Sequence, residues 1–383
     1  MITVLIVLAA LWLAFSNGAN DNFKGVATLY GSDTLSYRKA LGLATVTTFA
    51  GSVVAIVAAK KLVATFSGAG LVPDDLAKMT TFSLAAGLGA ALTIFGATRI
   101  GMPTSTTHAL IGGLLGGGLA AQAQINGGVL VAKFAMPMLI SPLLAIAIAA
   151  SLYLVLTTLR QRLGVTKETS CICLTESLNP ALAIGDGTLA MSNNLLLDRR
   201  EVEIVVDTAV NCQPQMLETQ RYQGRILGIQ LQPLLDMLHI CSAGAVCFSR
   251  ALNDTPKIAA LLLMTAFLPG PVSLVVIGLL MAIGGVIQSR RIAETMSKRI
   301  TNLNPGQGLT ANLTTAGLVL FASNWGLPVS TTHVSCGAIF GIGAMNRQAQ
   351  WKTIVSILTT WLTTLPCAAL LSGLLYLTLK RLA

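Results

Sequence analysis

The sequence predicts an all-α integral membrane protein made of two inverted-topology repeats, whose broken helices and Ser-Thr-Thr segments form a central site. Of its 383 residues, 54% are hydrophobic and 10% are charged, whereas soluble domains carry about 25% charged residues. A polar pattern also occurs twice. Asn-Asp-Asn-Phe-Lys at 20–24 returns as Asn-Asp-Thr-Pro-Lys at 253–257, and Pro-Thr-Ser-Thr-Thr-His at 103–108 returns as Pro-Val-Ser-Thr-Thr-His at 328–333. Such duplication in apolar sequence is typical of a transporter.

Long apolar stretches predict the membrane helices. Each can cross a hydrocarbon core of roughly 30 Å. The first run, 1–19, lacks the basic region of a signal peptide because the first cation is Lys24, so we expect it to remain as a transmembrane helix. The other stretches lie at 40–59, 80–97, 129–156, 271–287 and 354–379.

The chain divides into three blocks. We expect a first transmembrane repeat at 1–158, a hydrophilic cytoplasmic insert at 159–229 and a second transmembrane repeat at 230–383. Aligning the two motifs aligns the remaining segments in the same order. The expected pairs are 2–30 with 232–267, 40–59 with 271–288, 80–98 with 309–323, 103–121 with 328–346, and 129–157 with 351–379.

The distribution of charge predicts that the repeats are inverted. The loop after the first helix carries Arg38 and Lys39 in the first half but no charge at 268–270, and the next loop is more basic in the second half. When corresponding loops of two repeats differ in opposite directions in their Lys/Arg content, the repeats have opposite orientations in the membrane. We expect the amino terminus outside, the insert inside, and an odd number of crossings in each half. The Ser-Thr-Thr-His segments must then contribute a net crossing.

The net charge of +10 does not indicate nucleic-acid binding. The basic residues lie at segment ends without a basic stripe, which fits a multi-pass protein of the cell (plasma) membrane. The insert is nearly balanced, with seven Lys/Arg and eight Asp/Glu, and its stretch 195–206 suits a short strand or helix. Its Cys171 and Cys173 form an isolated Cys-x-Cys without a second ligand pair, so we expect no metal site there.

Ionisable residues inside the apolar helices mark the candidate site. Asp21 and Lys24 in one half correspond to Asp254 and Lys257 in the other. Charged groups at membrane depth are costly and commonly line a substrate or ion path, and i, i+3 spacing puts each pair on one helix face. Breaks are expected near Gly18 and at Pro256. Free N–H groups at a break attract anions, and free carbonyls attract cations.

The Ser-Thr-Thr segments predict two helix starts that suit an oxyanion. A proline two residues earlier favours the first helical turn, where hydroxyls lie beside free N–H groups. Ordinary capping and interhelical hydroxyl bonds are the alternative. His108 and His333 are candidates for gating or proton transfer, or equally for hydrogen-bonded struts. The hydroxyl candidates are Ser105, Thr106, Thr107, Ser330, Thr331 and Thr332.

Gly18-Ala19-Asn20-Asp21, together with the paired Pro-x-Ser-Thr-Thr-His segments, resembles the inorganic phosphate transporter (PiT) family over nearly the whole chain. The resemblance implies a homodimer of inverted repeats that carries phosphate with sodium or protons. It also implies that Asn20, Asn253 and the Ser-Thr-Thr residues bind the anion, while Asp21 and Asp254 hold the coupling cation, either sodium or a proton.

Two lysines depart from the family pattern. The family motif commonly reads Gly-Ala-Asn-Asp-Val-Ala-Asn-Ala, and this chain has Lys24 and Lys257 where the second Asn is usual. Two hypotheses follow. Either the lysines replace bound cations beside Asp21 and Asp254, which makes transport sodium-independent or proton-coupled, or they bind the anion directly and alter the choice between phosphate and sulfate.

The function predicted from the sequence is therefore secondary active transport of inorganic phosphate by alternating access, coupled to sodium or to protons. No catalytic residue is expected, and no cofactor other than a bound sodium if sodium is the coupling ion. A permease for sulfate or another oxyanion is the alternative. An intramembrane enzyme acting on a phospholipid or polyprenyl phosphate, and an anion channel, are more distant alternatives. The acids are few, duplicated and inside helices, which does not suit an enzyme that holds its acids on loops beside a metal.

Overall fold

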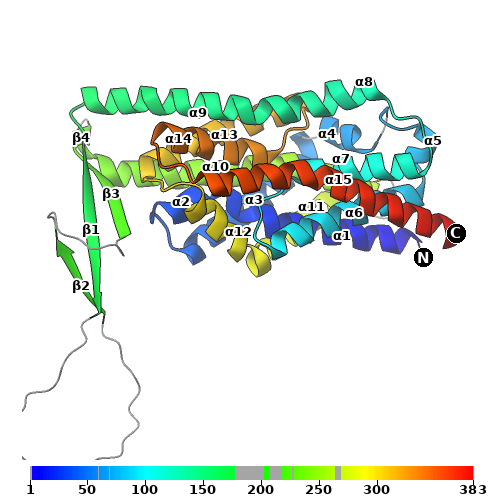
Figure 1. Ribbon diagram of the computed structural model, residues 1–383, viewed down its shortest axis with the longest axis horizontal. Helices are drawn as coiled ribbons and strands as arrows, with labels where there is room; N and C mark the ends of the chain where they lie inside the picture. The colour runs from blue at the N-terminus through cyan, green and yellow to red at the C-terminus, as the bar shows by residue number, and fades with distance from the viewer. Residues whose placement is uncertain are drawn as a thin grey trace, which may run out of the picture.

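The computed structural model is a bundle of long helices with strands at one end (Figure 1). It describes residues 2–58, 60–68, 70–176, 202–207, 217–226, 228–263 and 269–382. Within these, seven helical segments are long and apolar enough to cross a membrane. They are Thr3–Gly25, Tyr37–Ala58, Thr80–Arg99, Gly127–Arg162, Leu231–Leu262, Gly270–Gln288 and Trp351–Leu382.

The first half begins with a broken helix and ends with a very long one. A 3-10 turn, η1, follows α1, and a π-helical turn, η2, precedes α9. The elements are α1 (Ile2–Asp21), η1 (Asn22–Gly25), α2 (Ala27–Gly31), α3 (Tyr37–Ala58), α4 (Lys60–Phe66), α5 (Asp74–Ala77), α6 (Thr80–Arg99), α7 (Thr106–Ala120), α8 (Gly127–Val129), η2 (Leu130–Ala135) and α9 (Met136–Arg162).

The second half repeats this order with longer helices at its start and end. A π-helical turn, η3, stands between its second and third long helices. The elements are α10 (Leu231–Leu263), α11 (Gly270–Gln288), α12 (Arg290–Glu294), η3 (Thr295–Arg299), α13 (Pro305–Trp325), α14 (Thr331–Met345) and α15 (Trp351–Leu382).

The expected helix breaks are found in the first half but not in the second. The chain leaves the α-helix directly after Asp21, close to the position predicted from Gly18. The prediction for Pro256 is wrong, because α10 continues through it. A long helix fixed on many sides tolerates the loss of one N–H bond. Its expected end at 264–267 lies outside the described residues.

The all-α prediction is wrong for the insert. The antiparallel sheet has the order β2-β1-β3, with Cys171 paired to Asp207 across β1 and β2. Threonine, valine and isoleucine favour strands because branched side chains suit a pleated surface. Of the short element predicted at 195–206, the structure describes only 202–206, which lie in a strand. Residues 195–201 lie outside the described residues. The strands are β1 (Thr166–Glu176), β2 (Val202–Asp207), β3 (Leu217–Gln223), β4 (Arg225–Ile226) and β5 (Ile229–Gln230).

The two halves exchange packing partners. Helix α1 packs against α6 of its own half and α11 of the other, and α10 packs correspondingly against α13 and α3. The Ser-Thr-Thr helices also bridge the halves: α7 packs against α6 of its own half and α15 of the other, and α14 packs against α13 and α9. The two chain ends lie together, at the end of the bundle away from the strands (Figure 1). Each half therefore begins at one end of the bundle and finishes at the other.

The Ser-Thr-Thr helices are too short to cross a bilayer alone. Each of α7 and α14 has 15 residues, which gives a length of roughly 22 Å at 1.5 Å per residue. Both are buried over most of their length. They fit a position inside the bundle, where a short helix together with the segment before it can contribute one crossing.

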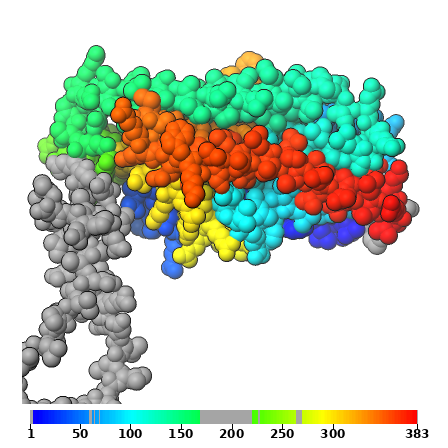
Figure 2. All heavy atoms as spheres, viewed as in Figure 1, coloured from blue at the N-terminus to red at the C-terminus, as the bar shows by residue number. Residues whose placement is uncertain are grey.

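The outer surface suits lipid. In Figure 2 the segment formed by α8, η2 and α9 makes the upper edge of the molecule along its whole length. This segment exposes large apolar side chains that water would not solvate favourably. They include Val131, Leu139, Leu143, Leu154 and Val155, each more than half exposed.

Glycines allow the closest contacts between helices of different halves. A Cβ atom at Gly284 in α11 would lie 2.0 Å from the carbonyl oxygen of Phe15 in α1. A Cβ atom at Gly116 in α7 would lie 1.9 Å from the carbonyl oxygen of Ala369 in α15. Close backbone approach is a main source of helix association in membranes, where the hydrophobic effect between helices is absent.

We expect Gly284→Ala to lower the stability of the folded bundle by about 1–3 kcal/mol, because α1 and α11 must move apart. Thermal unfolding in detergent micelles measures the loss. Gly96→Ala is the matched control, since a Cβ there meets nothing within 4 Å. Equal unfolding temperatures for the two variants would contradict the importance of this contact.

Candidate functional site

The predicted site residues come together in one buried network. The end of α1 with η1, and the middle of α10, lie against the first turns of α7 and α14. Nearly all of these side chains are at most 6% exposed, and His108 is half-buried. The residues are Asn20, Asp21, Lys24, Ser105, Thr106, Thr107, His108, Asn253, Asp254, Lys257, Ser330, Thr331, Thr332 and His333.

Lys24 is held by three oxygens from both halves. Its ammonium nitrogen donates to an oxygen of Asp21, to the backbone carbonyl of Thr104 at 2.8 Å and to the hydroxyl of Thr332 at 2.6 Å. An ammonium group has three donors and no acceptor. All three N–H groups of Lys24 are therefore satisfied within the protein.

Lys257 repeats this arrangement from the other half. Its nitrogen donates to an oxygen of Asp254 at 3.1 Å, to the carbonyl of Val329 at 2.9 Å and to the hydroxyl of Thr107 at 2.8 Å. Val329 corresponds to Thr104 in the aligned motifs. Each lysine thus binds the backbone before the serine of its own half and a threonine of the other half.

The two threonines also join the halves directly. The hydroxyl of Thr332 donates to the carbonyl of Thr104 at 2.6 Å, and that of Thr107 donates to the carbonyl of Val329 at 3.2 Å. Each hydroxyl therefore accepts from a lysine and donates to a carbonyl. These reciprocal bonds tie the entrance of each Ser-Thr-Thr helix to the opposite half.

The second carboxylate oxygens bind the middle residue of each Ser-Thr-Thr motif. Asp21 accepts from the hydroxyl of Thr106 at 3.1 Å and from the amide of Asn17 at 3.0 Å. Asp254 accepts from the hydroxyl of Thr331 at 3.2 Å. A buried carboxylate needs such partners because burial removes its water.

Asn20 and Asn253 hold the chain that leads into the Ser-Thr-Thr helices. The amide of Asn20 donates to Thr98 at 2.9 Å, and its carbonyl accepts from the backbone N–H of Thr104 at 3.0 Å. Asn253 donates to the carbonyl of Val329 at 3.2 Å and accepts from Ser323 at 3.3 Å. Both side chains shape the site through these bonds.

The serines cap the two short helices. Ser105 accepts from the backbone N–H of His108 and Ser330 from that of His333, both at 3.2 Å. Helices α7 and α14 therefore start directly after the serines. The prolines lie before these caps, and not in the first turn as predicted from the sequence. The first helical N–H groups lack a partner within the helix and can bind an anion.

The two histidines meet at the contact between the halves. The ring centroids of His108 and His333 are 4.5 Å apart, and His333 stacks on Trp361 at 3.8 Å. The Nδ1 atom of His108 lies 2.9 Å from the hydroxyl of Ser105. His108 thus has the hydrogen bond expected of a strut, whereas neither ring nitrogen of His333 has a hydrogen-bond partner among the described residues. A role of either histidine in gating or proton transfer stays a prediction.

Arg250 is an ionisable residue of the same apolar helix as Asp254 and Lys257, but no role in the site was predicted for it from the sequence. Its guanidinium is 2% exposed and donates only to neutral oxygens, those of Asn17 at 3.1 Å, Thr48 at 2.9 Å and Asn22 at 3.4 Å. Its Nε has no hydrogen-bond partner among the described residues. The signal in the sequence was an arginine inside an apolar helix, four residues before Asp254, where Asn17 stands in the first half.

The buried charges do not cancel. Within the described residues, the buried ionic side chains apart from histidines are Asp21, Lys24, Arg250, Asp254 and Lys257. Each lysine forms an ion pair with the aspartate of its own half. Each pair is neutral wherever its proton lies, so the buried network carries the single positive charge of Arg250.

Each lysine nitrogen lies in an oxygen set that suits a small cation. A carboxylate, a backbone carbonyl and a hydroxyl surround it in both halves, and hard cations prefer oxygen ligands of these kinds. In this structure the ammonium groups fill both positions. The role of Asp21 and Asp254 in holding a coupling cation stays a prediction.

Comparison with known proteins shows relatives over the full length. A model of the phosphate transporter family matches residues 17–372. A Bacillus subtilis protein named as a probable low-affinity inorganic phosphate transporter is 28% identical, over 100% of this chain and 98% of that protein. A solved structure described as the sodium-dependent phosphate transporter superposes with a TM-score of 0.75 at 20% identity, over 100% of both chains. At that identity the likeness shows the fold alone.

We expect Asp21→Asn to destabilise the fold by about 3–5 kcal/mol, because Lys24 would keep a buried charge without a counter-charge. Adding Lys24→Met should recover much of the loss. Thermal unfolding in micelles provides the measurement. Glu294→Gln is the control, since the Glu294–Arg290 pair is exposed at 3.6 Å and should contribute at most about 1 kcal/mol. A loss no larger than that of the control would contradict the proposed role of the buried pair.

Proposed function

This chain belongs to the phosphate transporter family, and on that premise we propose that the buried network between its halves is the place where phosphate is bound and carried across the membrane by alternating access. The paired sets of lysine, aspartate and Ser-Thr-Thr, each shared between the halves, carry this proposal. A site built equally from two halves is exposed to one side or the other when they rock against each other.

The inverted orientation of the halves is part of the proposal. It is supported by the opposite charge bias of corresponding loops and by the position of both chain ends opposite the strands (Figure 1). The reciprocal packing of α7 on α15 and of α14 on α9 fits the same arrangement. The amino terminus would then lie outside and the insert inside, in the plasma membrane, with a homodimer as the predicted assembly.

Phosphate would bind at the first turns of α7 and α14. Two helix N-termini bring free N–H groups and a favourable dipole, and serine and threonine hydroxyls lie beside them. In the structure those hydroxyls bond across the halves, from Thr332 to Thr104 and from Thr107 to Val329. Phosphate oxygens would compete for the same donors. Binding therefore exchanges bonds between the halves for bonds to the substrate and loosens their contact.

Of the two hypotheses for the lysines, the geometry favours replacement of the coupling cation. All three N–H groups of Lys24 are already bound to protein oxygens, as are those of Lys257. In each set one oxygen belongs to a carboxylate, which holds an ammonium more strongly than a carbonyl holds a threonine hydroxyl, so the lysines are less available to the anion. A fixed ammonium supplies the positive charge that a sodium ion would supply beside a carboxylate. Transport would then need no sodium, and a proton gradient is the remaining driving force.

Arg250 would set the charge of the transported anion. One uncompensated positive charge in a low-dielectric site is neutralised best by one negative charge. Phosphate near neutral pH is a mixture of monovalent and divalent anions, and sulfate is divalent. We therefore propose dihydrogen phosphate as the transported species, and this favours phosphate over sulfate.

Uptake of labelled phosphate into proteoliposomes tests the role of the lysines. We expect equal uptake by the unaltered protein with a sodium gradient or with potassium only, and stimulation by an inward proton gradient. Lys24→Asn and Lys257→Asn should lose uptake in potassium, because each frees an aspartate that then needs a cation, and sodium should restore part of it. Strict sodium dependence of the unaltered protein, or unchanged behaviour of both variants, would overturn the hypothesis.

Equilibrium binding in detergent tests the role of Arg250 without any gradient. We expect the affinity for total phosphate to fall as the pH rises from mildly acidic to mildly alkaline, while the affinity calculated for dihydrogen phosphate stays constant. Arg250→Gln should weaken phosphate binding by about tenfold or more, because the substitution removes a buried positive charge. Arg250→Lys keeps that charge and should therefore bind phosphate more tightly than Arg250→Gln.

Arg290→Gln is the control for that experiment, since Arg290 is exposed at a helix end. Its affinity for phosphate should equal that of the unaltered protein. Sulfate should compete poorly. Tighter binding at alkaline pH, or full competition by sulfate, would instead indicate a divalent anion.

A further inference from the structure

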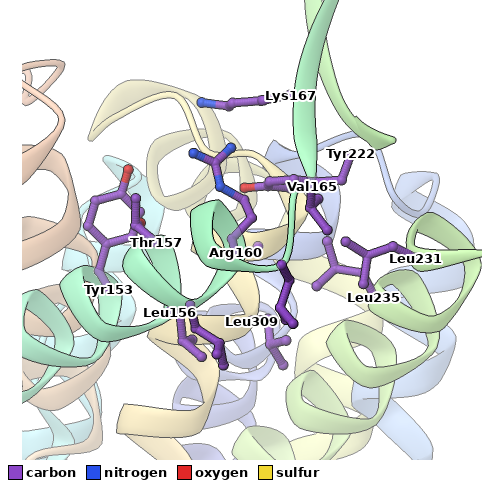
Figure 3. Close-up of a pocket in the computed structure, with 13 residues that line it drawn as sticks. Tyr153, Leu156, Thr157, Arg160, Val165, Lys167, Tyr222, Leu231, Leu235 and Leu309 are labelled. Carbon is purple, nitrogen blue, oxygen red and sulfur yellow. The ribbon is translucent and has the colours of Figure 1, made fainter. Parts of the chain in front are cut away.

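A cavity of about 190 Å³ lies at the strand end of the bundle, away from the network between the halves. It is formed where the end of α9 meets β1 and β3 of the insert and the first turns of α10 and α13. Figure 3 shows its lining, with Arg160 on α9, Lys167 on β1 and Tyr222 on β3 above a group of leucines. The insert and the membrane helices thus build this cavity together.

The floor of the cavity is apolar and continues onto the outer surface. Leu156, Leu231, Leu235 and Leu309 lie inside it. Leu163 also lines it and is 48% exposed, at the end of the same helix whose outer face suits lipid. A hydrocarbon chain lying along α9 could therefore enter without crossing water.

The mouth of the cavity is basic. Arg160 and Lys167 line it, and its lining contains no aspartate or glutamate. The guanidinium of Arg160 lies 5.7 Å from the ring centre of Tyr222. Burial, and then the positive charge of Arg160, lower the pKa of Lys167. Two neighbouring cations without a carboxylate among the lining residues form a site that an anion would stabilise.

We propose that this cavity binds an anionic phospholipid, with its headgroup phosphate between Arg160 and Lys167 and one acyl chain along the leucines. Three features favour a lipid over a soluble phosphate. The floor is apolar, it is open toward the lipid-facing end of α9, and it lies where a membrane helix ends in basic residues. Basic pockets at helix ends on one face of the membrane commonly bind lipid headgroups.

The bound lipid would connect the insert to the transport helices. Tyr222 on β3 donates to the side chain of Asn304 at 2.8 Å, and Asn304 caps α13. Asn304 also donates to Gln220 on β3 at 3.0 Å. A lipid held against Tyr222 would therefore fix the sheet relative to α13, which packs against α14.

Native mass spectrometry of the full chain, exchanged into micelles with dioleoyl phosphatidylglycerol or dioleoyl phosphatidylcholine, tests this site. We expect one phosphatidylglycerol molecule to stay bound, and phosphatidylcholine to be lost. Replacing Arg160 and Lys167 together by Gln should weaken retention by about tenfold or more. Arg162→Gln is the matched control, because Arg162 lies on the same helix end but does not line the cavity.

A second variant tests the apolar floor. Leu163→Trp adds bulk at a half-exposed position, so it should fold while blocking the lipid, and uptake of phosphate by each variant confirms folding. Equal retention of both lipids, or an equal loss in Arg162→Gln, would overturn the proposal. Displacement of the lipid by inorganic phosphate or glycerol phosphate would also overturn it, since the site would then recognise a soluble anion.

Discussion

The placement of two ammonium groups inside a membrane protein is the constraint on which the rest of this structure depends. A buried cation is tolerated only when its hydrogens and its charge are both satisfied. Lys24 and Lys257 each satisfy this with an aspartate one helical turn away, a carbonyl of their own half and a hydroxyl of the other. Because one of those three partners lies across the interface, neither half can satisfy its own lysine. The hydrogen bonds that satisfy the buried lysines are thus also bonds that hold the two halves together.

The sequence was sufficient for the parts of the fold that depend on local pattern. Apolar length predicted the long helices, and the duplicated motifs predicted the order in which they recur, including the 15-residue helices that start after Ser105 and Ser330. The i, i+3 spacing predicted the two aspartate–lysine pairs, which form as ion pairs in the structure. Spacing along one helix is a short-range property, so it can be read without knowing the tertiary arrangement.

The rest depends on contacts between distant segments. No local pattern indicates that Lys24 reaches Thr332, or that the carbonyls of Thr104 and Val329 complete the lysine sites. Pro256 suggested a break from its own chemistry, whereas packing on several sides keeps α10 continuous. Arg250 was visible as a charge in an apolar helix, but its significance appears only when its neighbours prove to be neutral. The halves also differ in charge at that position, since Arg250 of one half donates to Asn17, its neutral counterpart in the other. The two halves therefore resemble each other in shape but not in charge.

The exchange of helices between the halves has a consequence for how the chain is made. Helix α7 is synthesised early, yet it packs against α15, which is synthesised long after it. Until then its glycine face, which approaches the α15 backbone so closely at Gly116, has no partner. The first half therefore stays without this packing partner in the bilayer until α15 has been translated. Assembly of the buried network therefore waits for α15, so a nascent chain stalled before that helix lacks the packing that holds α7 in place.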